Sequence, residues 1–178
     1  MKLCVSFHIF SLLLFSIIHL YFDFIWQPYI VAFGTAADIL TAKTKYRQIR
    51  WKKNAQRMES LRTKLLQNLV EGIGDDVVKP NGPSEACKRL PNTLSVGLRN
   101  VQSGELLQEI QMRVACSAGS ACHSSGGKLS PVLEAMKVPM EFARGTLRLS
   151  VGPDTTQDDV DTAAKIIIKE VKRQLGAL

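Results

Sequence analysis

Cysteine and histidine are scarce in this chain, and no two cysteines stand at C-x-x-C spacing. The 178 residues contain four cysteines and three histidines. Cys116, Cys122 and His123 would supply at most three ligands, without the paired spacing of a structural zinc site. If the apolar first residues were removed, an odd number of cysteines would remain, which argues against a disulfide framework. These absences favour reduced thiols and an intracellular setting.

Acidic residues are absent between residues 43 and 57, where seven lysines and arginines are concentrated. The net charge of the whole chain is +7, so the rest of the sequence is neutral. We interpret the basic run as a solvated helix face, because a basic run alone is a weak motif. Tyr46 and Trp51 lie among the bases, which leaves nucleic-acid binding as the alternative that we rank last.

Formal charge is also absent from residues 3–22, LCVSFHIFSLLLFSIIHLYF. This run is just long enough to span a bilayer, and the basic run after it would favour a cytoplasmic C-terminal side. No small-residue cleavage site follows promptly, as a secretory signal peptide would require. We divide the chain into an apolar segment, residues 1–27, and a domain, residues 28–178. The segment is either a membrane anchor or a product of an incorrect gene model.

Hydrophobic periodicity predicts alternating helices and strands in the domain. The expected elements are a helix from about Thr35, a helix over 55–70, a loop or short strand over 77–88, a strand over 92–99, a short helix over 103–111 capped by Ser103, a short strand over 112–116, a short helix capped by Ser130, a strand over 146–152, and a last helix capped by Thr155 or Thr156. Strands with one polar face predict an α+β fold, in which helices back a small antiparallel or mixed sheet.

The segment CSAGSACHSSGG, residues 116–127, has few side chains that could pack. Between Ser117 and Gly127, Cys122 and His123 are the only residues that are not serine, glycine or alanine. Glycine makes such a backbone permissive, whereas a free cysteine is usually buried. Two interpretations stay open: a mobile arm that carries a reactive thiol, or a surface loop with an incidental cysteine.

Arg148 lies on a strand whose other face is apolar. Leu147 and Leu149 alternate with it, so Arg148 is expected on the polar face. An arginine on a rigid strand can bind a carboxylate through two parallel hydrogen bonds, although alone it could be an ordinary surface residue. Together, Arg148 and Cys122 would suit a small carboxylate-bearing substrate whose far end meets a thiol.

Three segments resemble the C-terminal part of the cysteine desulfurase and selenocysteine lyase family, within the class V aminotransferase group. They are RLPNTLSVGL, SAGSACHSSGGKLSPVLEAMKVP and ARGTLRLSVGPDTTQDDVD. PYIVAFGTAADIL is similar to the helical stretch that opens this part. The resemblance runs from about Pro28 to Leu178, and it implies the C-terminal small domain of a fold-type I pyridoxal phosphate enzyme.

The resemblance also implies an activity and site residues. Members of the family use pyridoxal phosphate to remove sulfur or selenium from cysteine or selenocysteine, leaving alanine. On this resemblance, Cys122 is the loop nucleophile, which carries a persulfide to a sulfur-acceptor protein, and Arg148 binds the substrate carboxylate. A cytoplasmic location is implied, unless segment 1–27 anchors the chain in a membrane.

The chain departs from the family's pattern in one respect. In the family a cofactor-binding domain precedes this part, and its Schiff-base lysine follows a histidine. No His-Lys dipeptide occurs here. We therefore expect no cofactor-binding or metal-binding residue in this chain and no activity by the chain alone. A dimer with a full-length relative, or with itself, would suit this expectation. The alternative is a non-catalytic module that accepts sulfur or binds a partner.

Overall fold

The computed structural model describes residues 27–41, 50–85, 88–119 and 130–176. The chain divides into two compact units, Met1–Lys53 and Asn54–Leu178. In the first unit, residues 27–41 form a helix whose residues are all exposed. The expected start near Thr35 was therefore wrong. The structure describes this helix from residue 27 onward, and Pro28 is part of it.

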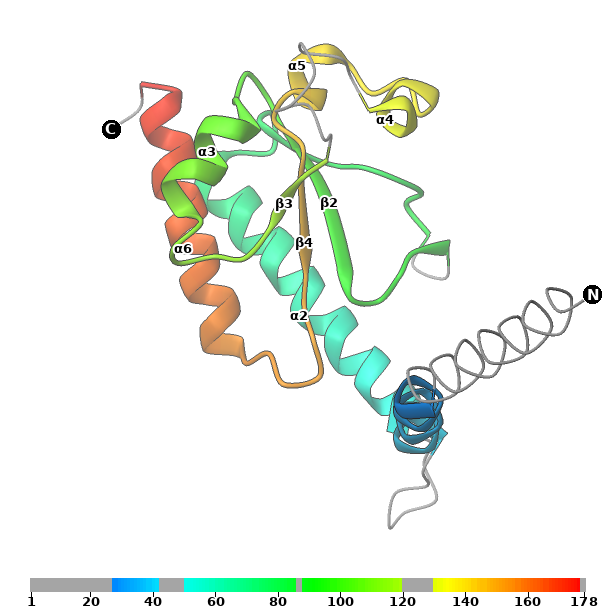
Figure 1. Ribbon diagram of the computed structural model, residues 1–178. Coiled ribbons are helices and arrows are strands. Elements are labelled where there is room, and N and C mark those ends of the chain that lie inside the picture. The colour runs from blue at the N-terminus through cyan, green and yellow to red at the C-terminus, as the bar shows by residue number, and fades with distance from the viewer. Residues whose placement is uncertain (1–26, 42–49, 86–87, 120–129, 177–178) are drawn as a thin grey trace, which may run out of the picture. The chain divides into compact units, whose positions relative to one another are not determined.

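The second unit contains a four-stranded sheet with the strand order β1-β2-β4-β3 (Figure 1). The described elements are α2 (Arg50–Ile73), which starts in the first unit, β1 (Val78–Pro80), β2 (Thr93–Leu98), α3 (Ser103–Ile110), β3 (Ser117–Ala118), α4 (Pro131–Ala135), α5 (Met140–Ala143), β4 (Leu147–Ser150) and α6 (Gln157–Gln174). Each of the three strand pairs is antiparallel. This arrangement confirms the predicted α+β class and makes the sheet antiparallel rather than mixed.

The core of the second unit lies between one face of the sheet and three helices. Its buried members include Leu61, Leu65 and Leu69 of α2, Leu106 and Ile110 of α3, Val160, Ala164, Ile167 and Val171 of α6, and Leu94, Val96, Leu98, Leu147 and Leu149 of the strands. The apolar stripes predicted for the long helices and the alternation predicted for the strands are confirmed. Burial of these side chains is the main force that stabilises the unit.

Two of the predicted helix caps are confirmed and one is wrong. Thr156 forms a capping box with Asp159, and Ser130 accepts a hydrogen bond from the Val132 N–H at 3.3 Å. Ser103 is not the N-cap of α3, because Gln102 occupies that position. Ser103 is buried, and its backbone N–H donates to the Arg144 carbonyl at 3.1 Å.

The strand predicted over residues 112–116 is also wrong, because β3 comprises only Ser117 and Ala118. Cys116 packs against the core instead of pairing with β4. The pairing is set further along, where the Gly119 N–H donates to the Thr146 carbonyl at 2.7 Å. A Cβ atom at Gly119 would overlap the Thr146 side chain, so glycine permits this close approach.

The basic run divides into exposed and structural members. Arg50, Lys52 and Lys53 are exposed, as a solvated helix face requires, and residues 42–49 lie outside the described part. Arg57 instead donates to the Thr155 carbonyl at 2.6 Å and to the Pro153 carbonyl. It thereby ties α2 to the loop that precedes α6, a role that the charge pattern does not reveal.

Candidate functional site

Four polar residues lie side by side across the sheet, on the face opposite the core. Ser95 of β2 and Ser117 of β3 both pair with Arg148 of β4. Asn81 follows β1, and its N–H donates to the Ser95 carbonyl at 2.9 Å. We call Asn81, Ser95, Arg148 and Ser117 the polar row. The predicted position of Arg148, on the face away from the apolar residues, is confirmed.

Arg148 has an exposed side chain that is free to bind a ligand. Within the described residues it makes no hydrogen bond or ion pair. Arg62 donates to the Leu90 carbonyl at 2.6 Å and Arg99 pairs with Glu141 at 3.2 Å, whereas the side chains of Arg113 and Arg144 are unpaired within the described residues, as that of Arg148 is. An unoccupied guanidinium on a strand can receive a carboxylate in a planar, bidentate arrangement.

The neighbouring rows of the sheet limit the space around Arg148. On one side, Phe142 of α5 covers Gly97, where an added Cβ would lie 3.0 Å from the Phe142 Cβ. On the other side, the hydroxyl oxygens of Thr93 and Ser150 are 3.5 Å apart. The polar row therefore lies between Phe142 of α5 and a pair of hydroxyls, and its four residues carry one positive charge and no carboxylate.

Sequence analysis identified Arg148 but missed the other members of the polar row. Ser95 stands on the polar side of a recognised alternation, and this signal could have found it. Ser117 could not be assigned, because the strand was predicted too early. Asn81 lies in a turn-rich stretch, and only the pairing of β1 with β2 reveals its position.

The predicted nucleophile, Cys122, and its neighbour His123 lie outside the described residues. The described thiol is that of Cys116, which is half-buried beside the core. Burial raises the pKa of the Cys116 thiol, and this lowers its reactivity, because the thiolate is the nucleophile. Cys116 is therefore poorly suited to the role that sequence analysis gave to Cys122.

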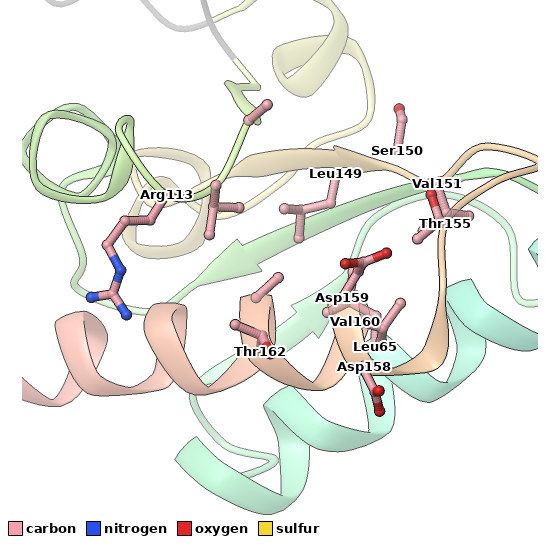
Figure 2. Close-up of a pocket in the computed structure, with 13 residues that line it drawn as sticks. Leu65, Arg113, Leu149, Ser150, Val151, Thr155, Asp158, Asp159, Val160 and Thr162 are labelled. Carbon is pink, nitrogen blue, oxygen red and sulfur yellow. The ribbon is translucent and has the colours of Figure 1, made fainter.

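A hollow of about 440 Å³ lies at the edge of the core. Figure 2 shows Leu149 of β4 pointing toward Val160 of α6 and Leu65 of α2. Asp159 at its rim belongs to the capping box. Arg148 does not line this hollow. We place the candidate site on the polar row because Arg148 is the arginine that the sequence singled out; Arg113 and Asp158, whose side chains are unpaired within the described residues, also line the hollow.

Helices that cross a bilayer must be long and predominantly apolar. None of those within the described residues is long and apolar enough to span a membrane. Residues 3–22, on which the membrane alternative depends, lie outside that part of the chain.

The sequence profile of the class V aminotransferases matches residues 28–162. A cysteine desulfurase from Frankia sp. is 39% identical over 145 residues, which are 81% of this chain and 32% of the relative. The selenocysteine lyase of Homo sapiens is 31% identical over 154 residues, covering 85% of this chain and 32% of the relative. The chain thus spans about a third of the length of these curated relatives.

A solved structure has a similar fold. A NifS-like protein superposes with a TM-score of 0.53 and 26% sequence identity. The superposition covers 71% of this chain and 29% of that protein. The similarity of fold therefore concerns a part of the larger protein, as the similarity of sequence does.

Proposed function

Because the chain belongs to the class V aminotransferase family, we propose that it provides the substrate-carboxylate site and the thiol of a cysteine desulfurase or selenocysteine lyase. The similar proteins carry these two activities in their names. They act on cysteine or selenocysteine, both of which have a carboxylate at one end and a chalcogen at the other. The two residues proposed for this chain, Arg148 and Cys122, match those two ends.

The observation that carries the proposal is the unoccupied guanidinium of Arg148 in the polar row. Arg148 binds the substrate carboxylate in this proposal, with two N–H donors facing two oxygens. Ser117 of β3 pairs directly with Arg148 of β4, and it lies at the start of the segment that leads to Cys122. In the sequence, the proposed thiol therefore follows a residue that pairs with Arg148.

Cys122 accepts a sulfur atom in this proposal. Its thiolate attacks the terminal sulfur of a persulfide on a donor protein. A new S–S bond forms at Cys122, the S–S bond of the donor breaks, and the donor leaves as a thiolate. No external oxidant is needed, because the transferred sulfur keeps its oxidation state. A segment of small residues suits a thiol that must reach both a donor and an acceptor.

Pyridoxal phosphate, which the family implies, would supply the electron sink for breaking the carbon–sulfur bond. It requires a lysine for its Schiff base. Lys79 is the only lysine in the four described strands, and its Nζ lies 5.6 Å from the centroid of the Phe142 ring. The polar row contains neither a lysine nor a carboxylate. The polar row therefore does not fit this cofactor, and we derive no step through it.

Sulfur transfer tests the thiol part of the proposal. The full chain is incubated with a persulfide-loaded, complete cysteine desulfurase, and peptides are analysed by mass spectrometry. We expect Cys122 to gain one sulfur atom, Cys122→Ser to abolish this gain, and Cys116→Ser to leave it unchanged. Equal labelling of Cys87, Cys116 and Cys122 would contradict a dedicated acceptor. Alanine release from cysteine by the chain with added pyridoxal phosphate would contradict the expected inactivity of the chain alone.

Carboxylate binding separates this proposal from the alternative, a non-catalytic sulfur acceptor. An acceptor needs Cys122 but not Arg148, whereas a substrate site needs both. We expect L-alanine, the product-like ligand, to shift the NMR signals of Arg148 and its neighbours, and L-alaninamide to leave them unchanged. If sulfur reaches Cys122 but L-alanine does not bind, the acceptor interpretation is the better one.

A further inference from the structure

We propose that Ser95 donates a second hydrogen bond to the carboxylate bound at Arg148, and that Asn81 orients Ser95 for this purpose. The inference rests on the proposed function, because it takes Arg148 as the carboxylate site. Neither residue was singled out by sequence analysis. Ser95 would be a binding residue, since it touches the ligand, whereas Asn81 would be a positioning residue that acts through Ser95.

The register of β2 and β4 brings the side chain of Ser95 close to that of Arg148. The Val151 N–H donates to the Asn92 carbonyl at 2.9 Å, so these two residues form a hydrogen-bonded pair. From this pair onward, non-hydrogen-bonded and hydrogen-bonded pairs alternate along β2 and β4. Ser95 and Arg148 consequently form a non-hydrogen-bonded pair, the closer kind, in which Cα atoms are about 4.5 Å apart.

The next pair of the same kind supports this geometry. Thr93 and Ser150 occupy the equivalent position two residues along the strands, and their hydroxyl oxygens are 3.5 Å apart. Side chains of such pairs therefore meet on this face of the sheet. Ser117, on the other side of Arg148, belongs to a hydrogen-bonded pair, where the Cα separation is wider, about 5.5 Å. Ser95 is thus better placed than Ser117.

The hydrogen bonds of Asn81 determine what Ser95 can do. The Asn81 Nδ2 donates to the Ser95 Oγ at 3.2 Å, and the Asn81 N–H donates to the Ser95 carbonyl at 2.9 Å. The Ser95 hydroxyl accepts in the first of these bonds, so its own proton remains to be donated. The described residues offer no acceptor for that proton. A carboxylate held by Arg148 would supply one.

This arrangement selects for a carboxylate. Arg148 and Ser95 both present donors, and the side-chain amide of Asn81 faces Ser95 with its own donor. A ligand with an amide in place of the carboxylate would bring an NH₂ group, which cannot accept from these donors. The small neighbours of Arg148 on both sides, Ser95 and Ser117, leave room for the carboxylate end of an amino acid.

The test is a titration of the full chain with L-alanine, followed by NMR. Ser95→Ala should raise the Kd about tenfold, the effect of losing one hydrogen bond to a charged group. Ser95→Thr keeps the hydroxyl and should bind nearly as tightly as the wild type. Thr93→Val, the matched control, removes a hydroxyl from the adjacent pair and should leave the Kd unchanged. Thermal unfolding of each variant checks that the fold is retained.

Asn81→Asp tests the orientation of Ser95 separately. Its carboxylate can only accept, so it takes the Ser95 proton and adds a negative charge beside the ligand. We expect weaker binding than in Ser95→Ala. The variant also keeps Ser95 in place, so it remains informative should Ser95→Ala unfold. Binding of Asn81→Asp at the wild-type level would overturn the role of Asn81.

The outcomes distinguish this inference from the proposed function. Failure of the wild-type chain to bind L-alanine would overturn the carboxylate site, and the role of Ser95 with it. Binding that is lost in Arg148→Ala but retained in Ser95→Ala would overturn the role of Ser95 alone. Loss in both variants, with full retention in Ser95→Thr and Thr93→Val, is the result that the inference requires.

Discussion

The two faces of the sheet differ in what covers them. On one face, β4 presents Leu147 and Leu149, which are 0% and 4% exposed, to α2, α3 and α6. On the other face, the same strand presents Arg148 and Ser150, which are exposed. Successive side chains of a strand point to opposite faces. Residues adjacent in sequence therefore belong to the core on one face and to the proposed binding site on the other.

From this difference we expect that the proposed binding site can be altered without altering the fold. The apolar face is closed by packing, and its residues have no free polar group. The polar row has small side chains and one unoccupied guanidinium, so removing it leaves no cavity. Substitutions at consecutive positions of β4 should consequently differ in their effect on the free energy of unfolding, which is large on the apolar face and small on the polar face.

The largest expected effect is on the apolar face. Leu147→Ala should lower the free energy of unfolding by about 3 kcal/mol, because it leaves a cavity in the core. The adjacent change, Arg148→Ala, should alter it by less than about 0.5 kcal/mol. Urea denaturation followed by circular dichroism measures both. A comparable loss in Arg148→Ala would show that the polar face also stabilises the fold.

Gly119→Ala should have the next largest effect, because the added methyl group overlaps the Thr146 side chain. We expect a loss of about 1–3 kcal/mol, typical of overpacking. Adding Thr146→Ser to this variant removes the clashing methyl and should restore part of the stability. Gly152→Ala is the control, since an added Cβ there meets only the Thr155 Oγ1, at 3.8 Å. Equal losses for the two alanine variants would contradict the close approach at Gly119.

Thr156→Ala should lower stability by about 1 kcal/mol, because it removes the capping box of α6. Hydrogen bonds from the Thr156 N–H and hydroxyl lower the pKa of the Asp159 carboxyl. The Asp159 carboxylate therefore contributes to the stability of the fold above the ordinary aspartate pKa. This contribution is lost as the pH falls through the lowered pKa.

The pH dependence supplies the measurement for this cap. The stability difference between the wild type and Thr156→Ala should narrow in acid, as thermal unfolding over a pH series would show. Thr162→Ala, an exposed change within α6, serves as the control and should show no such dependence. A constant difference across the series would mean that Asp159 does not contribute through its charge.

The smallest expected effect is kinetic and concerns Cys116. Burial raises the pKa of this thiol, so its contribution to stability is present below the ordinary cysteine pKa and is lost as the pH rises through the raised value. We expect Cys116 to react with iodoacetamide more slowly than the same cysteine in an unfolded peptide of residues 112–119. Equal rates at neutral pH, measured by peptide mass spectrometry, would contradict its burial.

Sequence patterns predicted the elements that can be recognised from residues adjacent in the sequence. The alternation around Leu94 and Leu147 predicted two strands and the face of Arg148, because a strand repeats every two residues whatever its partner. The acidic first turn of α6, with Thr156 before it, likewise predicted a helix start from neighbouring residues alone.

Sequence patterns did not predict the features that depend on a residue distant in the sequence. The apolar run 112–116 resembles a strand, but its pairing depends on Thr146, about thirty residues away, and begins only at Ser117. Asn81 belongs to the polar row because of the register of β1 with β2. No pattern in the neighbouring sequence predicts this register. The polar row was therefore only partly predictable: Arg148 was visible in the sequence, whereas its neighbours Asn81, Ser95 and Ser117 were not.

The contact made by Arg57 has a consequence for how the chain is made. Arg57 and Thr155 are hydrogen-bonded although they lie 98 positions apart. During synthesis on the ribosome, α2 is translated before the strands and α6. The leucines of α2 therefore stay unburied until those later elements have been translated. Closure of the unit is thus a late, long-range event, which slows folding. Nascent chains that end before α6 would leave these leucines uncovered, and we expect them to be held by chaperones.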